Sequence, residues 1–202
     1  MGKKTNPYAF LDIKAQGEEL TTLEGKKYFK WFWKNIYTLV SERRKGKYLL
    51  HNTLQNEAGI WLQSFGWDVE YEVPFSQGGF SNEKVRFDIV AERKKELWVI
   101  EIKDELTHRD TGQVHVYANY LQSRKQKGKV WLGIDLLAFD ELLRNEPLVE
   151  AVGELMNEED IGLMLIDKHV IVFLHNINYL NATVLPELYF VDENDKIGGL
   201  GK

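Results

Sequence analysis

The segment from Val85 to Lys103 constrains the fold of this chain more than any other. Apolar and polar residues alternate from Val85 to Ala91, and a nearly continuous apolar run follows from Leu97 to Ile102. Period-two alternation is typical of a half-buried strand, and a short continuous apolar run is typical of a strand covered on both faces. The segment therefore predicts a β-hairpin whose second strand lies at the centre of a sheet.

Three charged residues lie within this hairpin: Asp88 on its first strand, and Glu101 and Lys103 on its second. Successive side chains of a strand alternate between faces, so Glu101 and Lys103 share one face. If Lys94 and Lys95 form the turn, Asp88 lies opposite Glu101. This register is provisional, because Asn-Gly is far more typical of a two-residue turn than Lys-Lys.

Two opposed carboxylates need a compensating charge. At a separation of ~5 Å and an effective dielectric constant of ~20 they repel by roughly 3 kcal/mol. Mg²⁺ typically binds one or two carboxylates together with waters and phosphate oxygens. We therefore expect a divalent cation at Asp88 and Glu101, with Lys103 beside the water or phosphate of a phosphoryl-transfer reaction. The alternative is a solvated sheet face with surface ion pairs, which the apolar surroundings of Glu101 disfavour.

The remaining chain predicts an α/β domain over 48–202 that follows an amino-terminal helical extension over 1–47. We expect helices over 24–44, 49–65, 110–127 and 140–157, the last broken at Pro147, and further strands over 67–75, 129–134, 161–166 and 170–174. The helix over 24–44 has a wide aromatic face, including Tyr28, Trp31, Phe32 and Trp33. Because one packing face cannot bury so much apolar surface, this helix predicts a homodimer or higher homo-oligomer. The alternative is that the helix folds back over its own sheet.

Composition excludes several classes of protein. The 202 residues are 44% hydrophobic and 28% charged, as in ordinary globular proteins. The absence of cysteine excludes disulfides and thiolate metal sites and favours a cytoplasmic location. No membrane span, signal peptide or nucleotide-binding glycine motif is recognisable, so neither a membrane nor a nucleotide cofactor is expected.

Charge is distributed unevenly along the chain. Lys26 to Lys47 contains eight basic residues and one acidic residue, whereas Asp140 to Lys202 contains four basic and thirteen acidic residues. The basic segment is either a solvated surface or a nucleic-acid contact. On the second interpretation, the residues expected to contact DNA are Arg43, Arg44, Lys45, Lys47, Arg124, Lys125, Lys127 and Lys129.

Asp88 together with Glu101-Ile102-Lys103 resembles the signature of the PD-(D/E)XK nuclease superfamily, and the resemblance covers roughly 49–135. It implies a restriction-endonuclease-like core: a helix, three antiparallel-connected strands, a helix and a further strand. Phe87 stands where the name-giving proline would be, although that proline is often missing in the family. Gln113 and Tyr117 resemble the Gln-x-x-x-Tyr motif of RecB-like members, and Arg43 to Gly46 resembles archaeal Holliday-junction resolvases.

The resemblance implies a Mg²⁺- or Mn²⁺-dependent deoxyribonuclease, either an endonuclease or an exonuclease, with branched or junction DNA among its expected substrates. The implied metal ligands are Asp88, Glu101, the Ile102 carbonyl and Glu57, and the implied catalytic residues also include Lys103, Gln113 and Tyr117. Glu70 or Glu72 could take the place of Glu57, and Gln113 and Tyr117 could serve only in helix packing. The alternative function is a catalytically silent protein of this fold that binds nucleic acid or supports assembly.

Overall fold

The computed structural model of the chain describes residues 34, 36, 38–41, 48–77, 80–124, 127–168, 170–175, 187–191 and 197–200. The elements are, in chain order, α3 (His51–Ser64), β1 (Asp68–Gln77), β2 (Phe80–Arg93), β3 (Glu96–Lys103), α4 (His108–Arg124), β4 (Gly128–Asp135), α5 (Leu136–Leu142), α6 (Glu146–Glu159), β5 (Gly162–Asp167), β6 (Val170–Leu174), β7 (Glu187–Val191) and β8 (Ile197–Leu200). The predicted helix over 24–44 falls largely outside these residues. Those described within it (34, 36 and 38–41) are helical.

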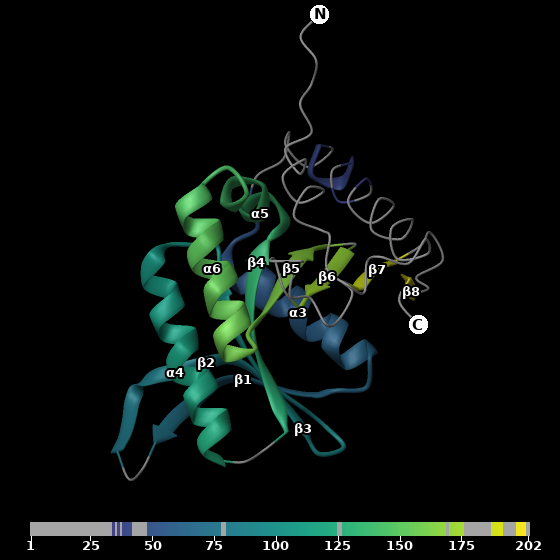
Figure 1. The fold of residues 1–202 in the computed structure, drawn as a ribbon. Coiled ribbons are helices and arrows are strands. Elements are labelled where there is room, and N and C mark those ends of the chain that lie inside the picture. The colour runs from purple at the N-terminus through teal and green to yellow at the C-terminus, as the bar shows by residue number, and fades with distance from the viewer. Residues whose placement is uncertain are drawn as a thin grey trace, which may run out of the picture.

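The strands of this part of the chain form one mixed sheet in which their spatial order equals their order in sequence (Figure 1). β4 runs parallel to β3 and β5 runs parallel to β4, and the other neighbouring pairs are antiparallel. Helix α3, the antiparallel strands β1 to β3, helix α4 and the parallel strand β4 follow the order expected for a nuclease-like core. The mixed α/β prediction is confirmed.

Helices cover both faces of the sheet, as Figure 1 shows. Residues of α4, α5 and α6 form one buried cluster with one face, and Ile36 and Val40 belong to it. Residues of α3 form a second buried cluster with the opposite face. On β3, Val99 belongs to the first cluster and Ile100 and Ile102 to the second, which confirms a central strand covered on both sides. Among the described helices, none is long and apolar enough to cross a bilayer.

The predicted hairpin register is confirmed where β2 and β3 are paired. Arg93 lies opposite Glu96 and Ile89 opposite Ile100, with Lys94 and Lys95 in the turn. Lys94 has a φ of 61°, the left-handed conformation that two-residue hairpin turns require and that glycine or asparagine usually supplies. The tight turn therefore forms without the residues that normally predict it.

The prediction of one helix over 140–157 with a break at Pro147 is wrong in detail. Two helices, α5 and α6, occupy this region, and Pro147 lies in the first turn of α6. Proline is tolerated there because the first amides of a helix have no partner within it. The Asn145 side chain caps α6 by accepting from the Leu148 N–H at 3.4 Å. Strands β7 and β8 were not predicted.

Candidate active site

Asp88 lies where the pairing of β2 with β3 ends. Ile89 and Ile100 form the last regular pair, and the next position places Asp88 opposite Glu101. Asp88 Oδ2 accepts a hydrogen bond from the Ile102 N–H at 2.7 Å, so the carboxylate replaces a backbone partner at this point. The N–H and C=O of one strand residue point to the same side, so the Ile102 carbonyl also faces the opening between the strands.

Glu101 is a buried carboxylate with one satisfied and one unsatisfied oxygen. Its exposed fraction is 3%, and its Oε1 accepts from Lys103 Nζ at 2.7 Å. Its Oε2 is buried and has no hydrogen-bond partner among the described residues. Burial and then the charge of Asp88 raise the pKa of Glu101 to about 7, against the opposing effects of Lys103 and Tyr117. A buried carboxylate oxygen without a partner costs stability unless a ligand binds it.

Lys103 is held by three groups around its ammonium. Besides Glu101, Gln113 Oε1 accepts from Nζ at 3.2 Å and Asp110 Oδ1 lies 3.5 Å away. Burial lowers the pKa of Lys103, but Glu101, Asp110 and Asp88 outweigh it, so the net shift is upward. Lys103 therefore stays protonated at neutral pH, and it can donate hydrogen bonds but cannot act as a base.

Helix α4 contributes the predicted pair Gln113 and Tyr117. Gln113 Nε2 donates to the Tyr117 hydroxyl at 2.8 Å, and that hydroxyl donates to the Arg86 carbonyl at 3.2 Å. The buried Tyr117 ring packs edge-on against Phe87 at 4.7 Å between centroids. Burial raises the pKa of Tyr117, so its hydroxyl remains protonated. A chain of hydrogen bonds thus runs from Lys103 through α4 to β2.

Helix α3 brings His51 and Gln55 to Asp88, and sequence reasoning missed both. His51 Nε2 lies 3.4 Å from Asp88 Oδ2. Gln55 Nε2 donates to the Asp88 carbonyl at 2.7 Å and to Glu72 Oε1 at 3.0 Å. Residues four apart share a helix face, so these two side chains form a pair. The available signal was a glutamine within the apolar stripe formed by Leu54 and Ala58.

Glu57, predicted to complete the metal site, is not joined to it by any hydrogen bond or ion pair among the described residues. It follows Gln55 by two positions, about 200° around the helix, and therefore faces elsewhere. Among the described residues, Glu70 likewise forms no hydrogen bond or ion pair with the site. Glu72 reaches it only through Gln55.

The predicted DNA-contacting residues are not all near this cluster. Residues 43–45, 47 and 125 lie outside the described part of the chain, as does the side chain of Arg124. Lys127 lies 4.0 Å from Glu96, and Lys129 donates to Asp160 at 2.7 Å. β4 is parallel to β3, with Lys129 beside Trp98 and Ile134 beside Lys103, so Lys127 and Lys129 lie at the far end of the sheet from Lys103. At ~3.3 Å per residue, Lys129 and Lys103 are roughly 16 Å apart along the strands.

The residues present fit a divalent cation of the Mg²⁺ type. Among the described residues, no group of three or more histidine, cysteine, aspartate or glutamate side chains is arranged to hold a metal ion by itself. Mg²⁺ does not need one, because it commonly binds through one or two carboxylates and keeps several waters. Asp88 and Glu101 supply two carboxylates, and Oε2 of Glu101 is a buried oxygen with no hydrogen-bond partner among the residues that the structure describes.

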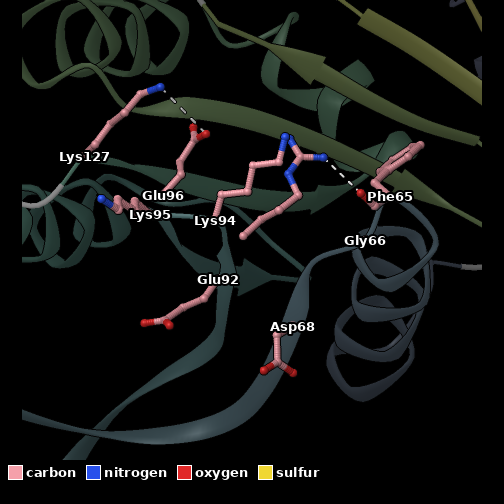
Figure 2. A pocket seen from close by; sticks show the side chains of 9 residues that line it. Phe65, Gly66, Asp68, Glu92, Lys94, Lys95, Glu96 and Lys127 are labelled. Atoms are coloured by element: carbon pink, nitrogen blue, oxygen red, sulfur yellow. Dashed lines mark hydrogen bonds and ion pairs between the residues drawn. The ribbon is translucent and has the colours of Figure 1, made fainter.

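A surface pocket of about 800 Å³ lies away from this cluster, at the end of the sheet where β3 begins. It is lined by both acidic and basic residues around the Lys94-Lys95 turn. Figure 2 shows Lys127 pointing toward Glu96, with Asp68 and Glu92 pointing away from them. The pocket contains none of the residues that surround Asp88 and Glu101.

Comparisons with known proteins are sparse. No protein-family model matches the sequence, and no curated protein matches it. Among solved structures, an XisH family protein from Nostoc punctiforme PCC 73102 is similar, with 21% sequence identity and a TM-score of 0.46. The similarity covers 56% of this chain and 90% of that one.

Proposed function

We propose that this chain is a metal-dependent deoxyribonuclease that hydrolyses phosphodiester bonds. The observation that carries the proposal is the arrangement of Asp88, Glu101 and Lys103 at the end of the β2 and β3 pairing. Two acids and a protonated lysine meet there, and one buried carboxylate oxygen has no hydrogen-bond partner in the part of the chain that the structure describes. DNA as the substrate follows from the PD-(D/E)XK resemblance of these residues.

The residues that would hold the cation are Asp88, Glu101 and the Ile102 carbonyl, with the His51 imidazole adjacent to Asp88. A divalent cation, when bound, supplies Lewis-acid polarisation of a phosphoryl oxygen and a lowered pKa of a bound water. The attraction of the Asp88 and Glu101 carboxylates for that positive charge offsets the desolvation cost of bringing it to a partly buried site.

Lys103 acts on the substrate. Its ammonium donates to water or phosphate oxygen and stabilises the negative charge that develops at phosphorus. The water oxygen forms a bond to phosphorus and releases one proton to solvent, the bond from phosphorus to the sugar oxygen breaks, and the sugar oxygen takes a proton from solvent. Gln113 and Asp110 hold the ammonium in place, and Tyr117 in turn holds Gln113.

The test is cleavage of plasmid, linear and four-way-junction DNA by the full chain in Mg²⁺, Mn²⁺ or EDTA. Asp88→Asn is the decisive variant, because asparagine keeps an oxygen that can accept from the Ile102 N–H while removing the charge. We expect cation-dependent cleavage by the wild-type chain and at least a 100-fold loss in Asp88→Asn. Asp68→Asn, at the other end of the sheet, is the matched control and should cleave normally.

DNA binding should survive in Asp88→Asn, since phosphate contacts and metal ligands are different groups. Near-normal cleavage by purified Asp88→Asn would refute the proposal. Binding by the wild-type chain without cleavage in either cation would instead support a silent nucleic-acid-binding protein.

A further inference from the structure

The apolar side chains of β1 and β2 switch from one face of the sheet to the other at the same level, directly next to the candidate active site. Val69 and Ile89 pack in the cluster under α3, whereas Val73 and Phe87 pack in the cluster under α4. Residues two apart on a regular strand share a face, so a switch between Ile89 and Phe87 requires an irregularity. The same switch occurs on β1 at the same level of the ladder.

The point at which the faces switch, called the crossing below, consists of Glu72 on β1 and Asp88 on β2. Tyr71 pairs with Ile89 and Val73 with Phe87, but the intervening positions, Glu72 and Asp88, form no regular pair. Glu72 has a φ of 51°, a left-handed conformation that is uncommon for residues other than glycine, asparagine and aspartate. A backbone arrangement of this kind persists only where surrounding contacts fix it.

One side chain contacts both residues of the crossing. Gln55 Nε2 donates to Glu72 Oε1 and to the Asp88 carbonyl, so each hydrogen of the amide has its own acceptor. Gln55 is buried, and its neighbours Leu54 and Ala58 are fully buried against the sheet, which fixes the position of the amide. Asp88 is thereby held twice: its carbonyl by α3 and its carboxylate by the Ile102 N–H of β3.

The residue type matches this role. A glutamate at position 55 would present oxygens to a carbonyl and a carboxylate, and a leucine or methionine would leave the carbonyl without a donor in a buried place. Of the side chains of this length, only a neutral amide supplies two donors to two oxygen acceptors without adding charge.

We propose that Gln55 is a positioning residue for the active site: it fixes the crossing of β1 and β2 and so aims the Asp88 carboxylate. The catalytic importance of this position rests on the proposed function, but the mechanical role does not. Groups that orient metal ligands typically change metal affinity or activity by 10- to 100-fold when removed.

The experiment compares wild type with Gln55→Met, which removes both donors and keeps the volume. Gln63→Met is the matched control, since Gln63 is exposed on the same helix. The first readout is amide hydrogen exchange of the metal-free full chain. The Ile102 amide should exchange at least 10-fold faster in Gln55→Met, because its acceptor is no longer held, whereas the Leu132 amide on β4 should not change.

The second readout is Mn²⁺ affinity by titration calorimetry, which should fall by 10- to 100-fold in Gln55→Met and stay unchanged in Gln63→Met. Unchanged protection of Ile102 refutes the positioning role, whatever the activity. If Gln55→Met loses protection at Ile102 while the wild type neither binds Mn²⁺ nor cleaves DNA, the result supports the positioning role of Gln55. The same result refutes the proposed function. If Gln55→Met does not fold, Gln55→Asn, whose amide is one methylene too short for both bonds, is measured in the same way with the same criteria.

Discussion

Replacing Glu101 by glutamine should raise the stability of the metal-free protein relative to wild type as pH increases from 5 to 8. Burial, with the charge of Asp88, raises the pKa of Glu101 from 4.5 to about 7 in the folded chain. The folded state therefore binds this proton more tightly than the unfolded state does. The stabilisation that the proton provides is complete below about pH 4.5 and is lost as pH rises through 7.

The magnitude follows from the size of this shift. Each pKa unit corresponds to about 1.4 kcal/mol, so the full effect is about 3 kcal/mol, most of it between pH 5 and pH 8. Glutamine does not titrate, and the Glu101→Gln variant escapes this loss. The free energy of unfolding of Glu101→Gln relative to wild type should therefore rise by 2 to 3 kcal/mol, as an order of magnitude, from pH 5 to pH 8.

Urea unfolding in EDTA at the two pH values measures this difference, because other titrating groups contribute nearly equally to both proteins. Glu154→Gln, on an exposed position of α6, serves as the control and should show no such change. A relative stability of Glu101→Gln that stays constant with pH, or that is larger at pH 5, would refute the reasoning. In the proposed reaction the same variant should be inactive, so stability and activity should change in opposite directions.

Four further predictions use other parts of the chain. His51→Ala should weaken Mn²⁺ binding more than Mg²⁺ binding in calorimetry, because imidazole suits transition metals better than Mg²⁺; equal losses for both ions would exclude His51 as a ligand. Alanine at all three positions of 43–45 should reduce the log–log salt slope of DNA binding by up to roughly three units, and an unchanged slope would make that segment a solvated surface. Gly128→Ala should destabilise by about 1–3 kcal/mol in thermal unfolding, since a Cβ there would lie 2.2 Å from the Leu97 carbonyl oxygen. Gly112→Ala, on open surface of α4, should instead stabilise by about 0.5–1 kcal/mol; destabilisation by this variant, or no loss of stability in Gly128→Ala, would contradict the respective expectation.

The part of the fold that could be predicted is the part with strong periodicity. The hairpin of β2 and β3 follows from alternation before the turn and an apolar run after it, and its register placed Asp88 opposite Glu101. Strand β7 (Glu187–Val191) contains an apolar run of only four residues, Leu188 to Val191, and was missed. Periodicity alone does not distinguish such a short apolar run from a buried helix segment.

The site residues that lie on the β2–β3 hairpin were predictable from the sequence. Those that reach the site through the packing of α3 on the sheet were not. His51 and Gln55 meet Asp88 because α3 crosses the sheet at that level, a tertiary relation that the helix periodicity does not contain. Lys127 and Lys129 were predicted to contact DNA together with the basic segment from Lys26 to Lys47. Because β4 is parallel to β3, the first residues of β4 lie beside the start of β3, at the other end of that strand from Lys103.

The hydrogen bond from the Ile102 N–H to Asp88 has an evolutionary consequence. Asp88 completes the edge of a strand pair, so a descendant that lost its activity would still be under selection to keep an aspartate there. Glu101 differs, because its ionised form costs stability and one of its oxygens contributes no hydrogen bond within the described structure. Drift would replace Glu101 soon after selection for catalysis ceased. Its retention, more than that of Asp88, is the mark by which a working member of such a lineage can be told from a silent one.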